Sequence, residues 1–108
     1  GEGAMSLSVI YITVGSADEA RALGRALVHE RLAASANVIE GATSFFWWQG
    51  ELQEASEALI VAKTKSALVP RVIARVKALH SYDCPCVLSV AIEDGNPDYL
   101  DWVAEQTL

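Results

Sequence analysis

The sequence predicts an α+β domain built from two βαβ units and a short C-terminal helix. Runs of β-branched residues alternate with segments in which apolar residues recur at the helical period. Residues typical of helix caps precede those helical segments. Apolar residues make up 52% of the 108 residues, which is enough for one modest core.

The first strand is predicted over Leu7–Val14, a β-branched run that is apolar on both faces. That pattern is typical of a central strand covered on both sides. Ser16 followed by Glu19 forms a capping box, so a helix is expected to begin there and to run to about Ala33.

Two long extended runs follow, and they are predicted to form a hairpin. The first is Asn37–Gln49, in which Gly41 indicates a bulge or bend. Gln49-Gly50 suits a compact turn. The second run is Glu51–Lys65, whose C-terminal half is apolar and is expected to be buried.

The second βαβ unit is completed by another helix and strand. Ser66 is expected to cap a helix that ends near Leu79, with Pro70 tolerated in its first turn. Cys84–Ile92 is the predicted fourth strand.

The last helix is predicted to begin after Asn96 as N-cap, with Pro97 at its first position. The element order is that of a ferredoxin-like βαββαβ sandwich with a long hairpin and an extra short helix. We expect a single domain over residues 5–108, and Gly1–Ala4 are expected to be a tag remnant.

One face of this sheet is expected to lack cover within the chain. A ferredoxin-like sandwich carries its two main helices on one face, but here the first and fourth strands are apolar on both sides. The terminal helix is too short to cover the other face. Sheets from neighbouring subunits are the simplest cover.

Composition excludes several classes of protein. A net charge of −6 argues against nucleic acid and anionic membranes as partners. No apolar run approaches the roughly 20 residues of a membrane span, and no leader is recognised, so a cytoplasmic location is expected. Cys84 and Cys86 are expected to be free thiols, which fits a reducing compartment.

No catalytic motif is present in the sequence. Neither a nucleophile elbow, a His-Glu-x-x-His helix, a dinucleotide-binding glycine motif nor a phosphate-binding loop occurs. The element order is shared with RNA-recognition motifs, but the basic flanks and glycine–aromatic spacing of those domains are missing. The sequence therefore predicts a protein that is not an enzyme.

Three stretches resemble the CutA family of divalent-cation tolerance proteins. They are Glu30–Asn37, Gly41–Glu51, and His80–Cys86 together with the later Gly95-Asn96 and Tyr99–Trp102. The resemblance covers nearly all of the chain after Met5. It implies a trimer of ferredoxin-like subunits whose long hairpins pair with neighbours, and a role in response to metal ions.

The chain departs from the family pattern at several positions. Ser35 stands where the family usually has cysteine, Ser81 where it has proline, and Cys86 where it has glutamate. Asp83 is a shortened carboxylate, and Val14 occupies a position at which some members carry cysteine. The metal ligands that the family implies are thus only partly present.

The aromatic run of the hairpin is predicted to lie at a trimer interface. One domain face can bury two such residues, whereas four would leave a large exposed patch on a monomer. Aromatic residues are enriched in interfaces. The alternative is an intrachain core with a partly exposed edge. The run consists of Phe45, Phe46, Trp47 and Trp48.

A metal site is the first functional hypothesis, with copper or another divalent metal as the candidate. Its predicted ligands are His80, Cys84 and Cys86, with Asp83 secondary. Imidazole and thiolate suit copper and zinc, and an extended strand would place the two cysteines on one face, about 6.5 Å apart at Cα. The alternative is a capping histidine and two packed thiols.

A PII-like regulatory signalling module that binds a small anion between subunits is the second hypothesis. Its cleft residues would be Lys63, Lys65, Tyr82, Tyr99 and Trp102, together with Asp83. Equally, Lys63 and Asp83 could form a purely structural ion pair.

Overall fold

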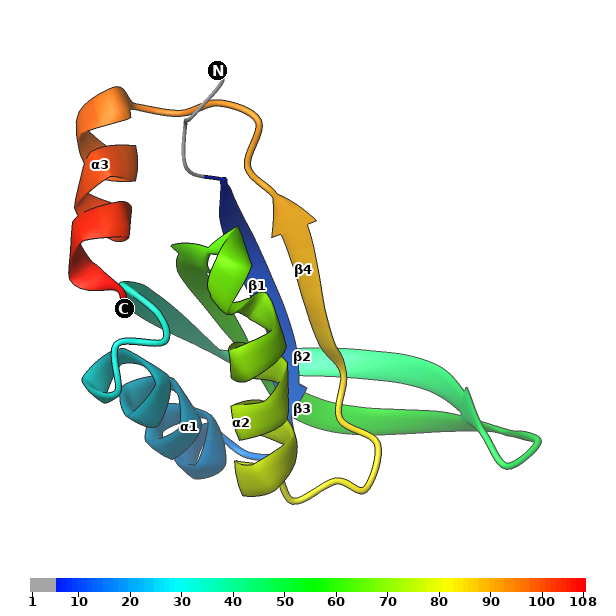
Figure 1. Cartoon of the computed structure of the whole chain (residues 1–108). Coiled ribbons are helices and arrows are strands. Elements are labelled where there is room, and N and C mark those ends of the chain that lie inside the picture. Colours follow the sequence, from blue (N-terminus) through cyan, green and yellow to red (C-terminus); the bar gives the residue numbers. More distant parts are fainter. Residues whose placement is uncertain (1–5) are drawn as a thin grey trace.

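The computed structural model describes residues 6–108, which form one antiparallel sheet with the strand order β2-β3-β1-β4. Its strands are β1 (Leu7–Val14), β2 (Ser35–Trp48), β3 (Glu51–Lys65) and β4 (Val87–Ala91). The helices are α1 (Ala17–His29), α2 (Val69–Leu79) and α3 (Pro97–Gln106), and a 3-10 turn η1 (Ser66–Leu68) precedes α2. Helices α1 and α2 lie on one face of the sheet (Figure 1). The predicted ferredoxin-like α+β fold is confirmed.

The core lies between this sheet face and the two helices. Every second residue of β1 points into it, and Ile10, Ile12 and Val14 are fully buried there beside Ile60 of β3. The stripe of α1 that meets them includes Leu23 and Leu27. Alternation with period two in the strands and a 3.6-residue period in the helices therefore produce one shared apolar layer.

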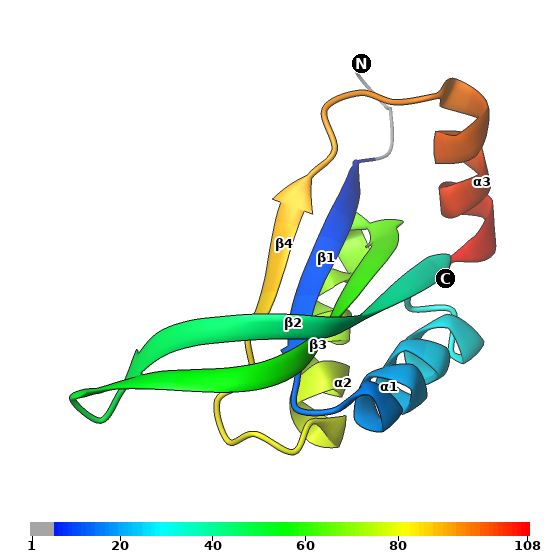
Figure 2. The ribbon, with the colours of Figure 1, turned by 180° about the vertical axis from the view of Figure 1, so that it is seen from behind.

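The opposite face of the sheet lies away from α1 and α2, as the view from behind shows (Figure 2), and only its end is covered, where Leu7 of β1 packs with Val103 of α3. This open face presents Tyr11 of β1 beside Leu88 of β4, its cross-strand partner. Leu88 is 57% exposed and Val90, two residues further on, is 62% exposed.

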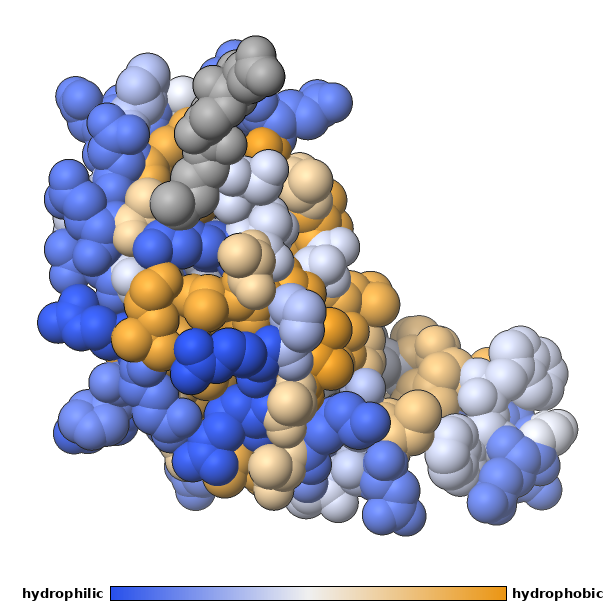
Figure 3. All heavy atoms as spheres, viewed as in Figure 1, coloured by the Kyte–Doolittle hydropathy of each residue, from blue (hydrophilic) through white to orange (hydrophobic). Residues whose placement is uncertain are grey.

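The β2–β3 hairpin extends well beyond the body and gives the molecule a length of 47 Å against a width of 25 Å. Figure 3 shows it as a projecting arm. The predicted bulge is present, because the register shifts between Ile39 and Ala42 and Gly41 has φ +81°. The turn is also as predicted: Gln49 and Gly50 both have positive φ, which the tight hairpin turn requires.

The caps of α1 and α3 match their sequence signals. Ser16 Oγ accepts a hydrogen bond from the Glu19 N–H at 3.1 Å, and Asn96 Oδ1 accepts from the Asp98 N–H at 3.1 Å. The predicted end of the first helix was wrong, because α1 ends at His29. Arg31 adopts a left-handed conformation with φ 59° and reverses the chain four residues early.

Ser66 was also wrongly predicted as a helix cap. Its hydroxyl instead lies 2.6 Å from that of Ser8 on β1, and α2 begins at Val69 after the 3-10 turn. Pro70 occupies the first turn of α2, where no partner for an N–H is needed.

The fourth strand is shorter than predicted, because it begins at Val87 rather than Cys84. Pro85 has no N–H to donate to a ladder, and only the Cys86 carbonyl reaches β1, accepting from the Thr13 N–H at 3.3 Å. The two cysteines therefore precede the strand, and their predicted place within it was wrong.

The expected tag remnant, Gly1–Ala4, lies outside the described residues. Within residues 6–108, no helix combines the length and apolar character needed to cross a membrane.

Candidate functional site

A pocket of about 670 Å³ lies where the hairpin leaves the open face and the loop before β4 passes over it. We call it the hairpin pocket. Aromatic side chains supply most of its apolar lining, from β1, the hairpin and the loop: Tyr11, Phe45, Phe46, Trp48 and Tyr82. Its carboxylates and thiols are those of Glu57, Asp83, Cys84 and Cys86.

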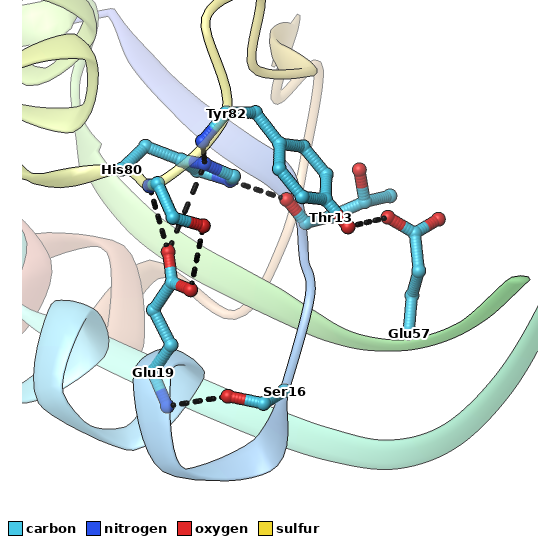
Figure 4. A network of polar contacts seen from close by, with 7 residues as sticks. Thr13, Ser16, Glu19, Glu57, His80 and Tyr82 are labelled. Atoms are coloured by element: carbon cyan, nitrogen blue, oxygen red, sulfur yellow. Dashed lines mark hydrogen bonds and ion pairs between the residues drawn. The ribbon is translucent and has the colours of Figure 1, made fainter.

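Glu57 and Tyr82 form the hydrogen bond at the base of this pocket. The Tyr82 hydroxyl donates to Glu57 Oε2 at 3.1 Å (Figure 4). Burial raises the pKa of Tyr82, and the neighbouring Glu57 carboxylate raises it further. The phenol therefore keeps its proton at neutral pH and remains a donor. The Glu57 residue itself is only 8% exposed.

His80 holds the start of the loop against β1. Its Nε2 donates to the Thr13 carbonyl at 2.7 Å, and its Nδ1 accepts from the Tyr82 N–H at 3.0 Å. These two bonds select the neutral tautomer with the proton on Nε2. Both ring nitrogens are occupied, and the side chain is fully buried.

Glu19 ties the same loop to the start of α1. Its carboxylate accepts hydrogen bonds from the Ser81 N–H at 3.0 Å and from the Ser81 hydroxyl at 2.8 Å. Partial burial has the largest single effect on the pKa of Glu19, and it opposes ionisation of the carboxylate. The two hydrogen bonds from Ser81 favour the carboxylate, and the pKa of Glu19 lies below its usual value. Figure 4 shows the carboxylate reaching up from α1 to the loop.

The structure does not assemble the predicted metal ligands into one site. No group of three or more His, Cys, Asp or Glu side chains among residues 6–108 is placed to hold a metal ion. His80 is turned toward Thr13, whereas Asp83, Cys84 and Cys86 line the hairpin pocket. Both cysteines are free thiols, and Cys84 is exposed.

The predicted anion cleft is divided between two ends of the sheet. Lys63 is six residues from Glu57, about 20 Å along an extended strand, so it lies far from Tyr82 and Asp83. Its Nζ donates to Asn37 Oδ1 at 2.7 Å, so the Lys63–Asp83 ion pair was wrong.

The other cleft residues lie at the far end with Lys63. Lys65 Nζ donates to the carbonyls of Thr107 and Leu108, at 3.3 and 2.8 Å. The rings of Tyr99 and Trp102 pack together, with their centroids 5.6 Å apart.

All four hairpin aromatics are exposed, from 41% for Phe46 to 73% for Trp47. Phe45, Phe46 and Trp48 line the hairpin pocket, and Trp47 does not.

Sequence reasoning missed Glu57. The available signal was strand alternation, which places this carboxylate on the same face as the apolar Leu59 and Val61.

Comparisons with known proteins agree with this fold. The model of the family described as CutA1 divalent ion tolerance protein matches residues 8–106. The divalent-cation tolerance protein CutA of Thermus thermophilus is 46% identical over 99 residues, 92% of this chain and 96% of the relative. Its namesake from Archaeoglobus fulgidus is 41% identical over 96 residues, 89% of this chain and 93% of the relative. The chain spans 56% of Protein CutA 1, chloroplastic, of Oryza sativa, to which it is 36% identical over 99 residues.

Solved structures give the same result. The Thermus thermophilus Cut A1 structure superposes with a TM-score of 0.91 at 46% identity and covers 94% of this chain and 98% of its own. CutA1 from Oryza sativa gives a TM-score of 0.94 at 35% identity, with 96% and 95% covered. The resemblance found in the sequence is confirmed, and the chain belongs to the CutA1 family of divalent ion tolerance proteins.

Proposed function

We propose that the chain acts in divalent-cation tolerance as a homotrimer, with the open sheet face and the hairpin aromatics as the contact between subunits. The observation that carries this proposal is the exposure of large apolar side chains both on the open face and on the hairpin. Tyr11, Leu88 and Val90 are 36%, 57% and 62% exposed on the open face, and the hairpin continues it. Monomeric proteins rarely expose large groups of apolar side chains on one face.

Gel filtration coupled to light scattering at micromolar concentration tests the assembly. We expect a mass three times that of the 11.6 kDa chain. A monomer mass that persists over a hundredfold range of concentration would refute the trimer. A dimer mass would agree with an open face that is covered by another subunit, but it would refute the threefold arrangement.

Copper or another soft metal ion is a second candidate, carried by the Cys84 and Cys86 thiols. The favouring observation is that both are free and line the hairpin pocket. Thiolates suit Cu(I), and Asp83 lines the same pocket as a secondary ligand. His80 would have to release the Thr13 carbonyl and the Tyr82 N–H before it could ligate.

A Cu(I) competition titration under reducing conditions tests the thiol site. We expect tight binding that the double variant Cys84→Ser/Cys86→Ser abolishes. His80→Asn serves as the control and should leave the affinity within about twofold, because both ring nitrogens are already occupied. Unchanged affinity in the double serine variant would show that the thiols only pack.

The PII-like alternative receives less support from the geometry. An anion cleft needs free cations, yet Lys63 and Lys65 are hydrogen-bonded to Asn37 and to the last carbonyls of the chain. The hairpin pocket presents carboxylates instead. A thermal-shift screen with small anions would favour this alternative only if a hit lost its effect in Lys63→Ala.

We further propose that the role is not catalytic and that the protein works in the cytoplasm. The free Cys84 and Cys86 support a reducing compartment. Cell fractionation with thiol labelling checks this: both thiols should label in the cytoplasmic fraction without prior reduction.

A further inference from the structure

We propose that a second copy of the chain completes the hairpin pocket, and that the Lys63 ammonium group of that copy pairs there with the Glu57 carboxylate. This inference rests on the proposed assembly and deepens it, because it names the two surfaces that meet and the charged pair between them. The contact is then directional: the hairpin end of one open face receives the opposite end of the next.

A ring of three chains needs two different surfaces on each chain. In a closed threefold arrangement the contact is heterologous, so a patch on one subunit meets a different patch on the next. The open face offers two such patches, one where the hairpin leaves the sheet and one beside α3 (Figure 2). Glu57 and Lys63 mark these two ends. They lie on the same face of β3, six residues and about 20 Å apart.

The hairpin end carries negative charge that its own chain does not neutralise. Glu57 accepts a hydrogen bond from the Tyr82 hydroxyl at Oε2, whereas no hydrogen bond among residues 6–108 reaches Oε1. Asp83 lines the same pocket. The ion pairs formed within residues 6–108 include neither carboxylate. A subunit that covers this end is therefore favoured when it brings a positive charge, since an unpaired carboxylate is costly to remove from water.

The positive charges of the chain are distributed unevenly. Six of the eight Lys and Arg residues lie on α1, on the turn after it, or on α2. Residues 35–57 contain no Lys or Arg, and neither do β1, β4 and α3. The remaining two cations are Lys63 and Lys65 of β3, which face the same side as Glu57. The open face of a second copy therefore brings its positive charge from the end far from the hairpin.

Lys63 is the better placed of these two lysines. Lys65 Nζ donates to the carbonyls of Thr107 and Leu108 at the end of the chain. Lys63 Nζ donates to one neutral acceptor, Asn37 Oδ1, at 2.7 Å, and an ammonium group has three hydrogens to donate. No ion pair within residues 6–108 includes Lys63. Its charge is therefore available to a carboxylate of another subunit.

The surroundings of Lys63 also match an aromatic hairpin. Ser35 is the cross-strand neighbour of Lys63, and its hydroxyl lies 3.4 Å from that of Tyr99. The rings of Tyr99 and Trp102 pack together and are both exposed. A hairpin placed against this end covers these two rings with its own exposed aromatic side chains. One contact then buries apolar surface and neutralises a charge.

Charge reversal at the two positions tests the pair. Lys63→Glu puts a like charge against the neighbour's carboxylate and should raise the concentration at which half of the chains dissociate by at least about tenfold. The double variant Glu57→Lys/Lys63→Glu restores an opposite pair and should return this concentration to within about threefold of the parent value. Light scattering coupled to gel filtration over a dilution series measures both effects.

Matched controls separate the pair from a change in net charge. Lys77→Glu makes the same change on α2, at an exposed position away from the open face, and should assemble as the parent does. Glu57→Lys/Lys77→Glu has the net charge of the restoring double variant and should remain dissociated. Circular dichroism checks the fold of each variant. If Glu57→Lys loses the parent spectrum, Glu57→Gln and Lys63→Met replace the reversals, and their combined effect should be smaller than the product of the separate ones.

Mass and coupling together separate this inference from the proposed assembly. A parent that stays monomeric refutes the assembly and with it the pair. A trimeric parent in which Lys63→Glu behaves like Lys77→Glu overturns the pair and leaves the assembly standing. The same holds if the double variant assembles no better than Lys63→Glu alone, or if the neutral variants act independently. Rescue in the double variant supports a contact between chains, because Glu57 and Lys63 of one chain are about 20 Å apart.

Discussion

The two faces of the sheet differ in how completely this chain covers them. On the helical face, Ile10, Ile12 and Ile60 are fully buried by α1 and α2. On the open face, Leu88 and Val90 remain more than half exposed although they are equally apolar. Both faces belong to the same strands, with side chains alternating between them.

This difference separates the residues that stabilise the fold from those available for interaction. Burial of the helical face supplies the hydrophobic free energy that folds one chain. Burial of the open face requires something outside the chain. Substitutions on the two faces should therefore have different signatures, and the following experiments test this.

The largest effect is expected on the helical face. Ile60→Ala removes a fully buried side chain from the core and should lower the free energy of unfolding by about 3 kcal/mol. The free energy of unfolding is measured by urea denaturation, monitored by circular dichroism, at several protein concentrations.

Leu88→Ala is the control for this experiment. Its side chain is 57% exposed, so any loss of stability should appear only at concentrations at which subunits associate. If Leu88→Ala costs as much as Ile60→Ala at every concentration, the two faces do not differ in this way.

Next in size is the effect of a charge on the hairpin. Phe46 and Leu79 are both 41% exposed, but Phe46 lies on the hairpin and Leu79 at the end of α2. Phe46→Lys should reduce the mass seen by light scattering to that of one chain, because an unpaired ammonium in an interface costs several kcal/mol.

The matched variant Leu79→Lys should keep the parent mass, and both variants should keep the parent circular dichroism spectrum. An unchanged mass in Phe46→Lys would remove the hairpin from the subunit contact.

A smaller effect is expected at the contact between α1 and the loop before β4. Ser81→Ala removes the hydrogen bond from the Ser81 hydroxyl to Glu19 and keeps the one from the backbone N–H, and it should cost about 1 kcal/mol at pH 7. The pKa of Glu19 is lowered in the folded state. Its contribution is therefore present above the unfolded pKa of about 4.3 and is lost as the pH falls through the folded value.

Thermal melts from pH 3 to pH 7 measure this dependence. The difference between Ser81→Ala and the parent should shrink at the acidic end. Ser56→Ala, in the exposed hairpin, should track the parent throughout. A difference that stays constant with pH would rule out the Glu19 carboxylate as its cause.

The smallest effect is expected at Tyr82. Its pKa is raised by burial and by Glu57, so its phenol should ionise above the usual range of a tyrosine in an alkaline absorbance titration. The contribution of this proton to stability is present below the unfolded pKa of about 10 and is lost as the pH rises through the folded value. Tyr82→Phe should remove the last step of the titration. Loss of an earlier step instead would contradict the assignment.

The fold and the local features could be predicted because their causes lie within a few residues. The Ser16 and Asn96 caps, the Gly41 bulge and the Gln49-Gly50 turn each depend on near neighbours in the chain. The ferredoxin-like element order, which puts both main helices on one side of the sheet, also predicted an open face. The family was recognisable because its motifs follow one another in order along the chain.

The placement of the site residues was decided by contacts between distant segments. Residues 57 and 82 are 25 positions apart, and only the loop that His80 anchors to Thr13 brings the Glu57 carboxylate to the Tyr82 phenol. The sequence alone determined the elements and the face that each side chain joins, since these depend on local backbone geometry and periodicity. Only the tertiary structure decided that Cys84 and Cys86 precede the strand, that the lysines lie at the far end, and that a carboxylate meets the hairpin aromatics. Loop paths and strand register bring such groups together, and neither is encoded in the spacing of a few residues.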